Sequence, residues 1–242
     1  MQRPTVGILG DQTVATAVTA AGGEPLAVDP TEDAVAETDV VVAVGEAGML
    51  TAADAGIESP LVPVDAGYAY RSVERSALER ALAAVFEQRH ETVELPVATA
   101  RTPLGETRAL AELMLVTGEP ARISEYTVVS RAERVATFRA DGVVVATPAG
   151  STGYTRRADG PVVAGGVDAF AVVPVAPFST DEDMWVVPMD GLELRVERDE
   201  TPVELLADDR TTGSVVPGES VRVGVETSLS VAVVPESSGR FR

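Results

Sequence analysis

The secondary-structure signals of this 242-residue chain change at about residue 92, and this change constrains the fold more than any other feature. Before it, apolar runs typical of strands alternate with helical stretches. We expect strands at residues 5–9, 25–28, 39–44 and 61–64. We expect helices at 11–21 and 72–86, a short helical turn before residue 39 and another short helix before residue 61. Such alternation favours a parallel sheet covered by helices. Residues 1–90 are therefore predicted to form a small doubly wound α/β domain.

From residue 92 onward the helical signals almost disappear. Short apolar runs follow one another, separated by glycine, proline and aspartate: 93–99, 110–116, 126–129, 136–138, 143–146, 171–175, 192–196, 203–206, 221–225 and 229–234. This spacing suits a β-sandwich. We therefore expect an all-β, sandwich-like domain over residues 91–242, with a C-terminal tail that packs back on the first domain.

The composition excludes several kinds of chemistry. The formal charge is -19, there is no cysteine, and all 19 basic residues are arginine. Without lysine, the chain has neither the phosphate-binding lysine of a P-loop nor a lysine that could form a Schiff base. The acidic balance disfavours nucleic-acid binding, which requires basic patches. An acidic surface is tolerated in concentrated salt, where screening acts over about 3 Å at 1 M, so we expect a halophilic source.

The chain shows no sign of membrane insertion or export. It has no apolar run of about 20 residues, so no membrane span is expected. The first residues lack the features of a signal peptide, which favours a cytoplasmic location. The single histidine, His90, excludes paired-histidine metal sites and is expected to be a solvated residue at a helix end.

The most informative motif runs from Asp141 to Tyr154 and reads DGVVVATPAGSTGY. A β-branched run ends at Thr147 and leads into a cluster of small and hydroxyl residues. A strand followed by such a turn and a helix start can offer N–H groups and hydroxyls to an anion. The plainer alternative is a strand-to-helix turn in which Ser151 or Thr152 caps the helix.

An α/β layer followed by a β-rich domain with this motif resembles the NAD kinase (ATP–NAD kinase) family. The family signature is an Asp-Gly pair, a strand, Thr-Pro-x-Gly-Ser-Thr-Ala-Tyr and then Gly-Pro. Gly153 replaces the alanine, and ten residues coincide: Asp141, Gly142, Thr147, Pro148, Gly150, Ser151, Thr152, Tyr154, Gly160 and Pro161.

The resemblance implies a nucleotide site that takes NAD or NADP, ATP and Mg²⁺. Tyr154 would stack on the dinucleotide and Asp141 would accept a hydrogen bond from it. The residues that would line the phosphate region are Gly150, Ser151 and Thr152, with Gly153 beside them.

The chain departs from the family at its second loop, Gly-Gly-Asp-Gly-Thr, which should follow the strand ending at residue 44. Gly45 and Gly48 match, but Ala47 stands at the position of the catalytic aspartate and Met49 at that of the threonine. Alanine has no proton acceptor and cannot act as a general base. Glu46 is one residue away and is a candidate for the same role. Alternatively, Glu46 simply begins a helix, where an acidic side chain suits the dipole.

Four further family motifs have lost side chains. The family's Asn-x-Gly-x-Leu-Gly-Phe stretch aligns with residues 65–71, of which Gly67 matches. Asn-Glu becomes Ala111-Glu112, Pro-His-Ser becomes Pro177-Phe178-Ser179, and Asp-Gly-Gln becomes Asp208-Asp209-Arg210.

Two charged features are additions to the family pattern. Arg156 and Arg157 follow Tyr154, and they could bind a nucleotide phosphate or pair with Asp159. The acidic residues 181–183 could bind a hard cation but are more typical of a solvated loop. No metal site is predicted in the chain's own residues.

Three functions remain open. The resemblance implies ATP-dependent phosphorylation of the 2′-hydroxyl of NAD, impaired or altered because of Ala47. The chain could instead be a non-catalytic dinucleotide-binding regulator or the partner of an active paralogue. It could also act on a changed substrate. Because family members usually assemble, the resemblance implies a homo-oligomer or a mixed oligomer with a paralogue. We expect no nucleic-acid or membrane partner.

Overall fold

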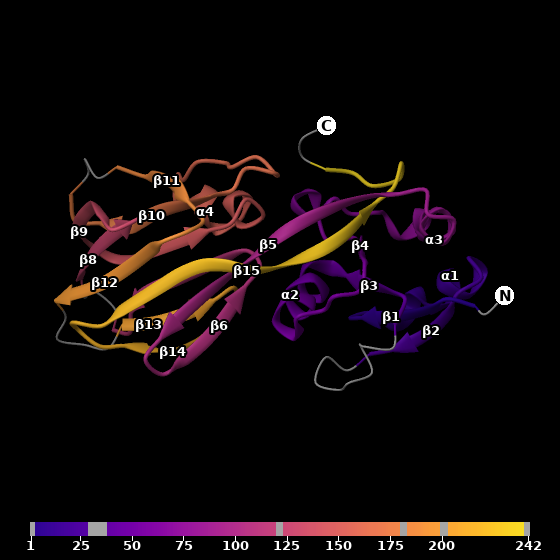
Figure 1. The fold of residues 1–242 in the computed structure, drawn as a ribbon, viewed down its shortest axis with the longest axis horizontal. Helices are drawn as coiled ribbons and strands as arrows, with labels where there is room; N and C mark the ends of the chain where they lie inside the picture. Colours follow the sequence, from indigo (N-terminus) through magenta and orange to yellow (C-terminus); the bar gives the residue numbers. More distant parts are fainter. Residues whose placement is uncertain (1–2, 29–37, 120–122, 180–182, 199–202, 240–242) are drawn as a thin grey trace. The chain divides into compact units, whose positions relative to one another are not determined.

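The computed structural model describes residues 3–28, 38–119, 123–179, 183–198 and 203–239. The chain divides into two compact units: Met1–Leu95 with Ser228–Arg242, and Pro96–Thr227. It passes from one unit to the other in two long strands, β5 (Glu91–Thr102) and β15 (Ser220–Val233) (Figure 1).

The first unit is built on a parallel sheet. Its strands are β1 (Thr5–Leu9), β2 (Glu24–Ala27), β3 (Val40–Val44) and β4 (Leu61–Val64), in the order β2-β1-β3-β4. The end of β15 lies beside β4, with Val231 opposite Leu61. All five residues of β3 are buried, as in a central parallel strand with both faces covered.

Helices cover both faces of this sheet. Short helix α1 (Ala15–Ala20), preceded by a 3-10 turn at Gln12–Val14, shares a core with α3 (Leu78–Phe86) and with one face of β1, β3 and β4. Helix α2 (Gly45–Ala55) lies on the opposite face, where a Cβ on Gly48 would lie 3.1 Å from the backbone of Ala43 and 3.2 Å from that of Leu9. The first unit is therefore doubly wound, as expected.

The helix expected at 72–86 starts later. Val73 forms a parallel bridge to Val64, and Ser72 forms an antiparallel bridge to Ser238. A 3-10 turn at Arg75–Ala77 then leads into α3. Pairing of residues 72 and 73 with extended segments thus displaces the first helical turn. The helical turn expected before residue 39 falls outside the described residues, and a 3-10 turn at Tyr68–Tyr70 was not expected.

The second unit is built almost wholly from strands in its described residues. They are β6 (Gly105–Ala109), β7 (Glu112–Thr117), β8 (Ser124–Ser130), β9 (Glu133–Ala146), β10 (Ala169–Pro177), β11 (Trp185–Pro188), β12 (Leu192–Arg198), β13 (Val203–Ala207) and β14 (Arg210–Val215), with parts of β5 and β15. One group has the order β11-β10-β9-β7-β13-β14, and another contains β8, β12 and β15. The result is the expected sandwich-like arrangement.

Strand β9 joins the two groups. Its first half pairs with β8, and its second half pairs with β7 on one edge and β10 on the other. The sequence patterns at 136–138 and 143–146 were expected to be separate strands, but both lie in β9. The patterns at 221–225 and 229–234 likewise lie in β15. In β9 the residues between the two patterns do not form a turn, because Ala140 pairs with β8 and β10 and Gly142 pairs with β7 and β10.

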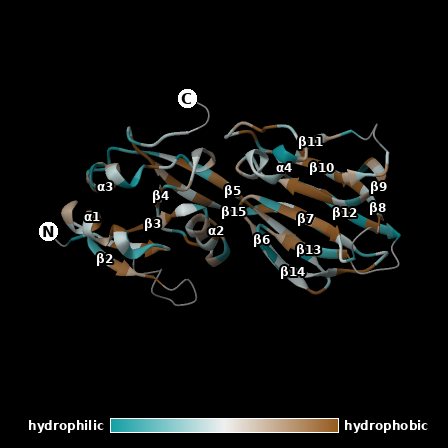
Figure 2. Ribbon diagram, turned by 180° about the vertical axis from the view of Figure 1, so that it is seen from behind, coloured by the Kyte–Doolittle hydropathy of each residue, from teal (hydrophilic) through white to brown (hydrophobic). Residues whose placement is uncertain are grey.

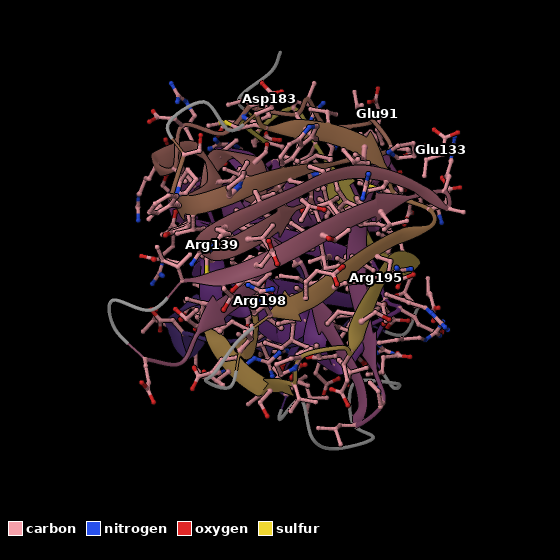
Figure 3. All side chains as sticks on the ribbon, turned by 90° about the vertical axis from the view of Figure 1, so that its left-hand side faces the viewer. Glu91, Glu133, Arg139, Asp183, Arg195 and Arg198 are labelled. Carbon is pink, nitrogen blue, oxygen red and sulfur yellow. The ribbon has the colours of Figure 1, made fainter. Side chains whose placement is uncertain are left out.

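The core of the second unit lies between its layers. The ring of Phe138 stacks on Trp185 at a centroid distance of 5.6 Å and contacts Tyr126 at 6.0 Å. Figure 2 shows β7 and β10 as largely hydrophobic, whereas α4 (Tyr154–Arg157) is hydrophilic. Charged side chains, among them Glu133 and Arg195, lie on the outside (Figure 3).

Candidate functional site

The first unit carries a loop at the carboxyl edge of its sheet. Strand β2 lies on one side of β1 and β3 lies on the other, so the connections that leave β1 and β3 run in opposite directions along the sheet. Open α/β sheets bind ligands at such a switch point. Gly10 and Gly45 follow these two strands with φ of 90° and 72°, in the left-handed region that favours glycine. This edge is the candidate ligand-binding part of the first unit.

The predicted residues of this loop are placed on α2. Glu46 and Ala47 are exposed in its first turn, whereas Met49 is buried at 0% exposure. A carboxylate oxygen of Glu46 accepts a hydrogen bond from the hydroxyl of Tyr70 at 3.2 Å. Glu46 therefore begins the helix, as the plainer alternative supposed, and its carboxylate also has a partner on the neighbouring turn.

A cluster centred on Arg75 lies at the same edge of the sheet. Its guanidinium contacts Asp11 at 2.7 Å and Asp65 at 3.2 Å, and also donates to the hydroxyl of Thr13. The backbone N–H of Thr13 and the Arg75 side chain lower the pKa of Asp11 from 3.8 to about 2. The three partners lie 10 to 64 positions from Arg75 in the chain, so no local sequence pattern indicated the cluster.

The second unit carries the loop of the Asp141–Tyr154 motif. Strand β9 ends at Ala146, and the Thr147 hydroxyl donates to the carbonyl of Leu110 at 2.6 Å. The N–H of Thr147 donates to the carbonyl of Ala111 at 2.9 Å. A 3-10 turn at Gly150–Thr152 then leads into the single turn of α4. The loop is thus held against the chain segment that enters β7.

The hydroxyls of the loop are directed into it. Ser151 is 0% exposed, donates to the carbonyl of Pro148 at 2.7 Å and accepts from the N–H of Val163 at 3.0 Å. Thr152 donates to the carbonyl of Ala149 at 3.2 Å. Neither hydroxyl caps a helix, because the residue before α4 is Gly153 and no side chain caps that turn. The alternative in which Ser151 or Thr152 caps a helix is therefore wrong, because these hydroxyls bond to carbonyls within the loop itself.

The groups that face solvent lie just beyond the turn. Gly153, Arg156 and Arg157 are exposed, and the Tyr154 side chain is 38% exposed. Among the described residues, neither arginine forms an ion pair with Asp159. An aromatic face and two cations are thus available at the end of the loop.

Asp141 does not join this group. It lies inside β9, half-buried, and six residues of extended chain separate it from Thr147, about 20 Å at about 3.3 Å per residue. Its neighbour Gly142 does not make a turn. A Cβ there would lie 2.5 Å from the carbonyl oxygen of Leu115.

Asp208 is a site residue that the sequence reading did not identify. It lies in the hairpin turn between β13 and β14, with φ of 52°. Its carboxylate accepts from the N–H groups of Leu110, Ala111 and Glu112 at 3.0, 2.8 and 3.0 Å. Burial raises the pKa of Asp208, and these three N–H groups oppose that shift. The retained aspartate of the altered Asp-Gly-Gln motif was the available signal.

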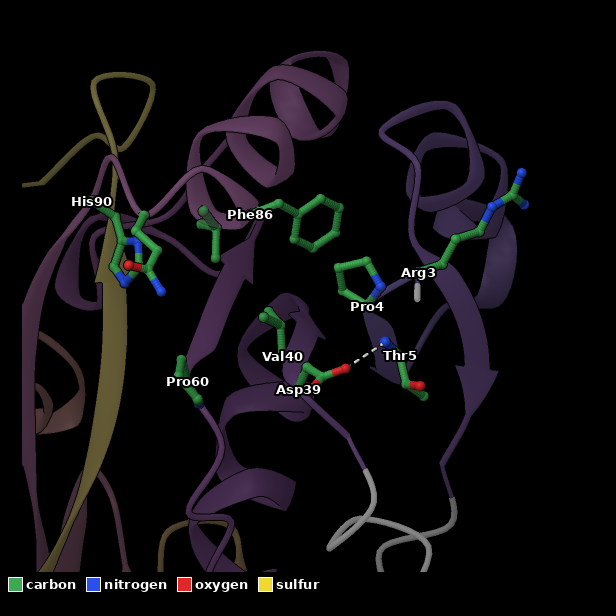
Figure 4. Close-up of a pocket in the computed structure, with 10 residues that line it drawn as sticks. Arg3, Pro4, Thr5, Asp39, Val40, Pro60, Phe86 and His90 are labelled. Atoms are coloured by element: carbon green, nitrogen blue, oxygen red, sulfur yellow. Dashed lines mark hydrogen bonds between the residues drawn. The ribbon is translucent and has the colours of Figure 1, made fainter. Parts of the chain in front are cut away.

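His90 differs from its expected solvated state. Its Nδ1 atom is buried and has no hydrogen-bond partner among the described residues. The ring lines a cavity of about 530 Å³ with Phe86, Pro4 and Asp39, shown in Figure 4. This cavity lies where β1 and β3 begin, at the opposite edge of the sheet from Gly45.

Neither a metal cage nor a membrane span is found in the described parts of the chain. No group of three or more histidine, aspartate or glutamate side chains converges there. Two of the three acids at 181–183 lie outside the described residues. None of the described helices has the length and apolar character needed to cross a membrane.

The sequence matches known proteins over most of its length. A family model described as the ATP-NAD kinase C-terminal domain matches residues 110–233. The chain is 34% identical to an NAD kinase of Symbiobacterium thermophilum over 214 residues, 84% of this chain and 75% of that protein. It is 43% identical to an NAD kinase of Methanosarcina barkeri over 83 residues, 34% of this chain and 30% of that relative.

Two solved structures share the fold. Yeast NADH kinase complexed with NADH has a TM-score of 0.82 at 17% identity, covering 97% of this chain and 85% of that chain. An NAD kinase from Archaeoglobus fulgidus in complex with ATP has a TM-score of 0.79 at 23% identity, covering 95% and 93%. The family model covers half of the chain, and a 34% identical relative extends the match across most of it. The chain therefore belongs to the NAD kinase family.

Proposed function

We propose that this protein binds NAD or NADP and ATP, and that its transfer of phosphate from ATP to the NAD 2′-hydroxyl is impaired or altered. The observation that most supports this proposal is the structure of the loop after β9. It is rigidly hydrogen-bonded inside and presents Tyr154, Arg156 and Arg157 to solvent. An exposed aromatic ring suits a nucleotide base, and guanidinium groups suit its phosphates.

Loss of the general base supports the altered activity. Ala47 occupies the position of the family's catalytic aspartate, and it is exposed on the first turn of α2. The neighbouring Glu46 carboxylate accepts a hydrogen bond from Tyr70, which directs it toward that turn. A general base contributes about 10² to 10⁴ in rate, while positioning and electrostatics supply much of the rest of phosphoryl transfer. Slow turnover is the expected consequence.

The magnesium ion fits this proposal as a companion of the nucleotide. Mg²⁺ at phosphoryl-transfer sites needs one or two protein carboxylates, because phosphates and water supply its other ligands. Glu46 is the carboxylate on the exposed first turn of α2 and could provide one. An all-protein cage is not required, in accord with the dispersed acids of the described residues.

A non-catalytic role is the second candidate. The same loss of a base at Ala47, with intact loop architecture after β9, suits a dinucleotide-binding regulator or the partner of an active paralogue. A homo-oligomer remains a prediction that size-exclusion chromatography with light scattering can check.

The test is an assay of NADP formation in molar KCl with Mg²⁺, ATP and NAD. The parent is expected to turn over slowly, and Ala47→Asp to raise the rate by about 10²-fold or more because it restores a proton acceptor. Ala47→Asn is the matched control, since it has the same shape without the base. Calorimetric titration with NAD, NADP and ATP measures binding in parallel.

Each outcome separates the hypotheses. Rapid turnover by the parent contradicts the impaired activity. Absence of turnover in both the parent and Ala47→Asp, together with saturable NADP binding, favours the regulator. No binding of any of the three nucleotides overturns the proposal as a whole.

Arg156 provides a separate prediction about phosphate recognition. Arg156→Ala should weaken NADP binding more than NAD binding, by about 10- to 100-fold, because a charge-assisted hydrogen bond contributes about 1.5–3 kcal/mol. Arg134→Ala removes an exposed arginine from β9 of the same unit and serves as the control for net charge. Equal losses for NAD and NADP would contradict contact with the 2′-phosphate.

A further inference from the structure

The turn between β13 and β14 is bound to one short segment of the chain. The Asp208 carboxylate accepts from three consecutive N–H groups, at residues 110, 111 and 112, over 2.8–3.0 Å. In return, the N–H of Asp208 donates to the carbonyl of Glu112 at 2.8 Å. Four hydrogen bonds thus join a single residue to a single three-residue segment, about 100 positions earlier in the chain.

That segment is in direct contact with the loop after β9. The carbonyls of Leu110 and Ala111 accept from the hydroxyl and the N–H of Thr147. The packing is so close that a Cβ on Gly150 would lie 2.0 Å from the Ala111 carbonyl oxygen. Any shift of the segment would therefore move the start of the loop or collide with it.

A second link reaches the far end of the loop. The Thr155 hydroxyl is buried in α4 and donates to the Glu112 carboxylate at 3.2 Å. Glu112 is itself the last of the three residues held by Asp208. The segment therefore contacts the loop before its 3-10 turn and again after it, on both sides of the exposed Tyr154.

We infer that Asp208 is a positioning residue: by fixing the segment at 110–112, it sets the shape of the loop that presents Tyr154 and Arg156. The inference rests on the proposed function for its consequence in nucleotide binding. A carboxylate suits the role because its two oxygens can accept all three N–H bonds, whereas an asparagine side chain has one acceptor oxygen. Without an acceptor, three partly buried N–H groups would lose their partners.

The test compares substitutions within one turn. Asp208→Ala removes both acceptor oxygens and Asp208→Asn retains one. Asp209→Ala is the matched control, because Asp209 is the exposed next residue of the same turn. Leu194→Ala, in a buried position on β12, controls for general destabilisation. Nucleotide dissociation constants are measured for NAD, NADP and ATP at a temperature at which Trp185 fluorescence shows every variant to be folded.

Asp208→Ala is expected to weaken nucleotide binding by about tenfold or more, with Asp208→Asn in between. Asp209→Ala and Leu194→Ala should stay within about twofold of the parent, although Leu194→Ala lowers the unfolding temperature. A dissociation constant for Asp208→Ala within about twofold of the parent overturns the inference. So does an equal weakening by Leu194→Ala, since the effect would then follow stability alone. If Asp208→Ala does not fold, Asp208→Asn is judged by the same criteria.

Hydrogen exchange separates this inference from the proposed function. Amides at 110–112 and 147–155 should exchange faster in Asp208→Ala than in Asp209→Ala, while those of β12 stay unchanged. If the parent binds no nucleotide, the proposed function fails and the exchange pattern alone decides whether Asp208 sets the loop. Unchanged exchange at 147–155 contradicts the inference in either case.

Discussion

Two glycines of the Asp141–Tyr154 motif are needed because other backbone atoms approach them closely. A Cβ on Gly142 would lie 2.5 Å from the Leu115 carbonyl oxygen, and one on Gly150 would lie 2.0 Å from that of Ala111. Neither residue has a positive φ. The motif therefore specifies close packing of β9 and its loop against β7. This need is separate from the backbone freedom that glycine gives to turns.

Substitution of Gly150 should be far more damaging than substitution of its neighbour Gly153. Gly150→Ala is expected to cost about 3 kcal/mol of unfolding free energy, because the clash is with backbone that cannot move freely. Gly153→Ala should cost less, about 1 kcal/mol, because its Cβ would lie 3.3 Å from the Gly150 carbonyl oxygen, a tight contact that a shift of a few tenths of an ångström relieves. Chemical denaturation followed by Trp185 fluorescence measures both. Similar stabilities for the two variants would contradict the packing argument.

At the scale of elements, connections between strands are held by a few side chains. Arg75, just before α3, joins the loop after β1 through Asp11 and the loop after β4 through Asp65. All three side chains are partly exposed, so their ion pairs are individually weak. Their value is geometric, because they hold two loops of the sheet's carboxyl edge in fixed positions.

The contribution of Asp11 should depend on pH. Its pKa is lowered from 3.8 to about 2, so the ionised carboxylate stabilises the folded state above about pH 4. That stabilisation is lost as the pH falls from about 4 to about 2. Asp11→Asn should therefore lower the unfolding temperature at pH 6, and the gap from the parent should close by pH 2. Thermal unfolding at fixed salt measures this gap; a gap that persists unchanged at pH 2 would contradict the role of the carboxylate.

Sequence patterns were least reliable in predicting which individual strands exist and where they end. Strand β14 is exposed at five of its six positions and has no apolar alternation, so nothing in its residues distinguished it from a loop. Strands β6 and β11 are short and were also missed. In β9 and β15, polar residues in the middle of a long strand imitated turns. Pairing decided these strands: β14, β6 and β11 each pair along one edge, and the second half of β9 pairs along both. Pairing is not encoded within the strand itself.

At the scale of the whole molecule, the acidic charge makes local cations important. A protein with a formal charge of -19 repels anionic ligands at long range, although molar salt screens this repulsion. Binding of a nucleotide then depends on short-range contacts, such as those that the exposed Arg156 and Arg157 can offer. The strongly acidic composition is the reason for testing activity in molar KCl.

The candidate site was only partly predictable. The turn at 150–154 and the arginines that follow it were identified from local patterns, whereas the glycine-containing segment at 45–49 was expected as a loop and forms the start of α2. The contacts of Asp208, the Arg75 cluster and the buried Nδ1 of His90 were not. Each depends on residues brought together from distant parts of the chain or on burial by them. Ser151 shows the same limit: its hydroxyl looked available to a ligand, but it is enclosed by Pro148 and Val163.

The sequence by itself determined that an α/β domain is followed by a β-rich domain, the order of the major strands and helices, and the family. It could do so because hydrophobic periodicity and motif residues are features of short stretches of chain. Only the tertiary structure decided which motif side chains face solvent, which hold the backbone, and how long strands continue through polar residues. These outcomes depend on hydrogen bonds and packing between residues far apart in the chain. Asp208 is the clearest case, since its three N–H partners lie about 100 residues away and no local pattern identifies them.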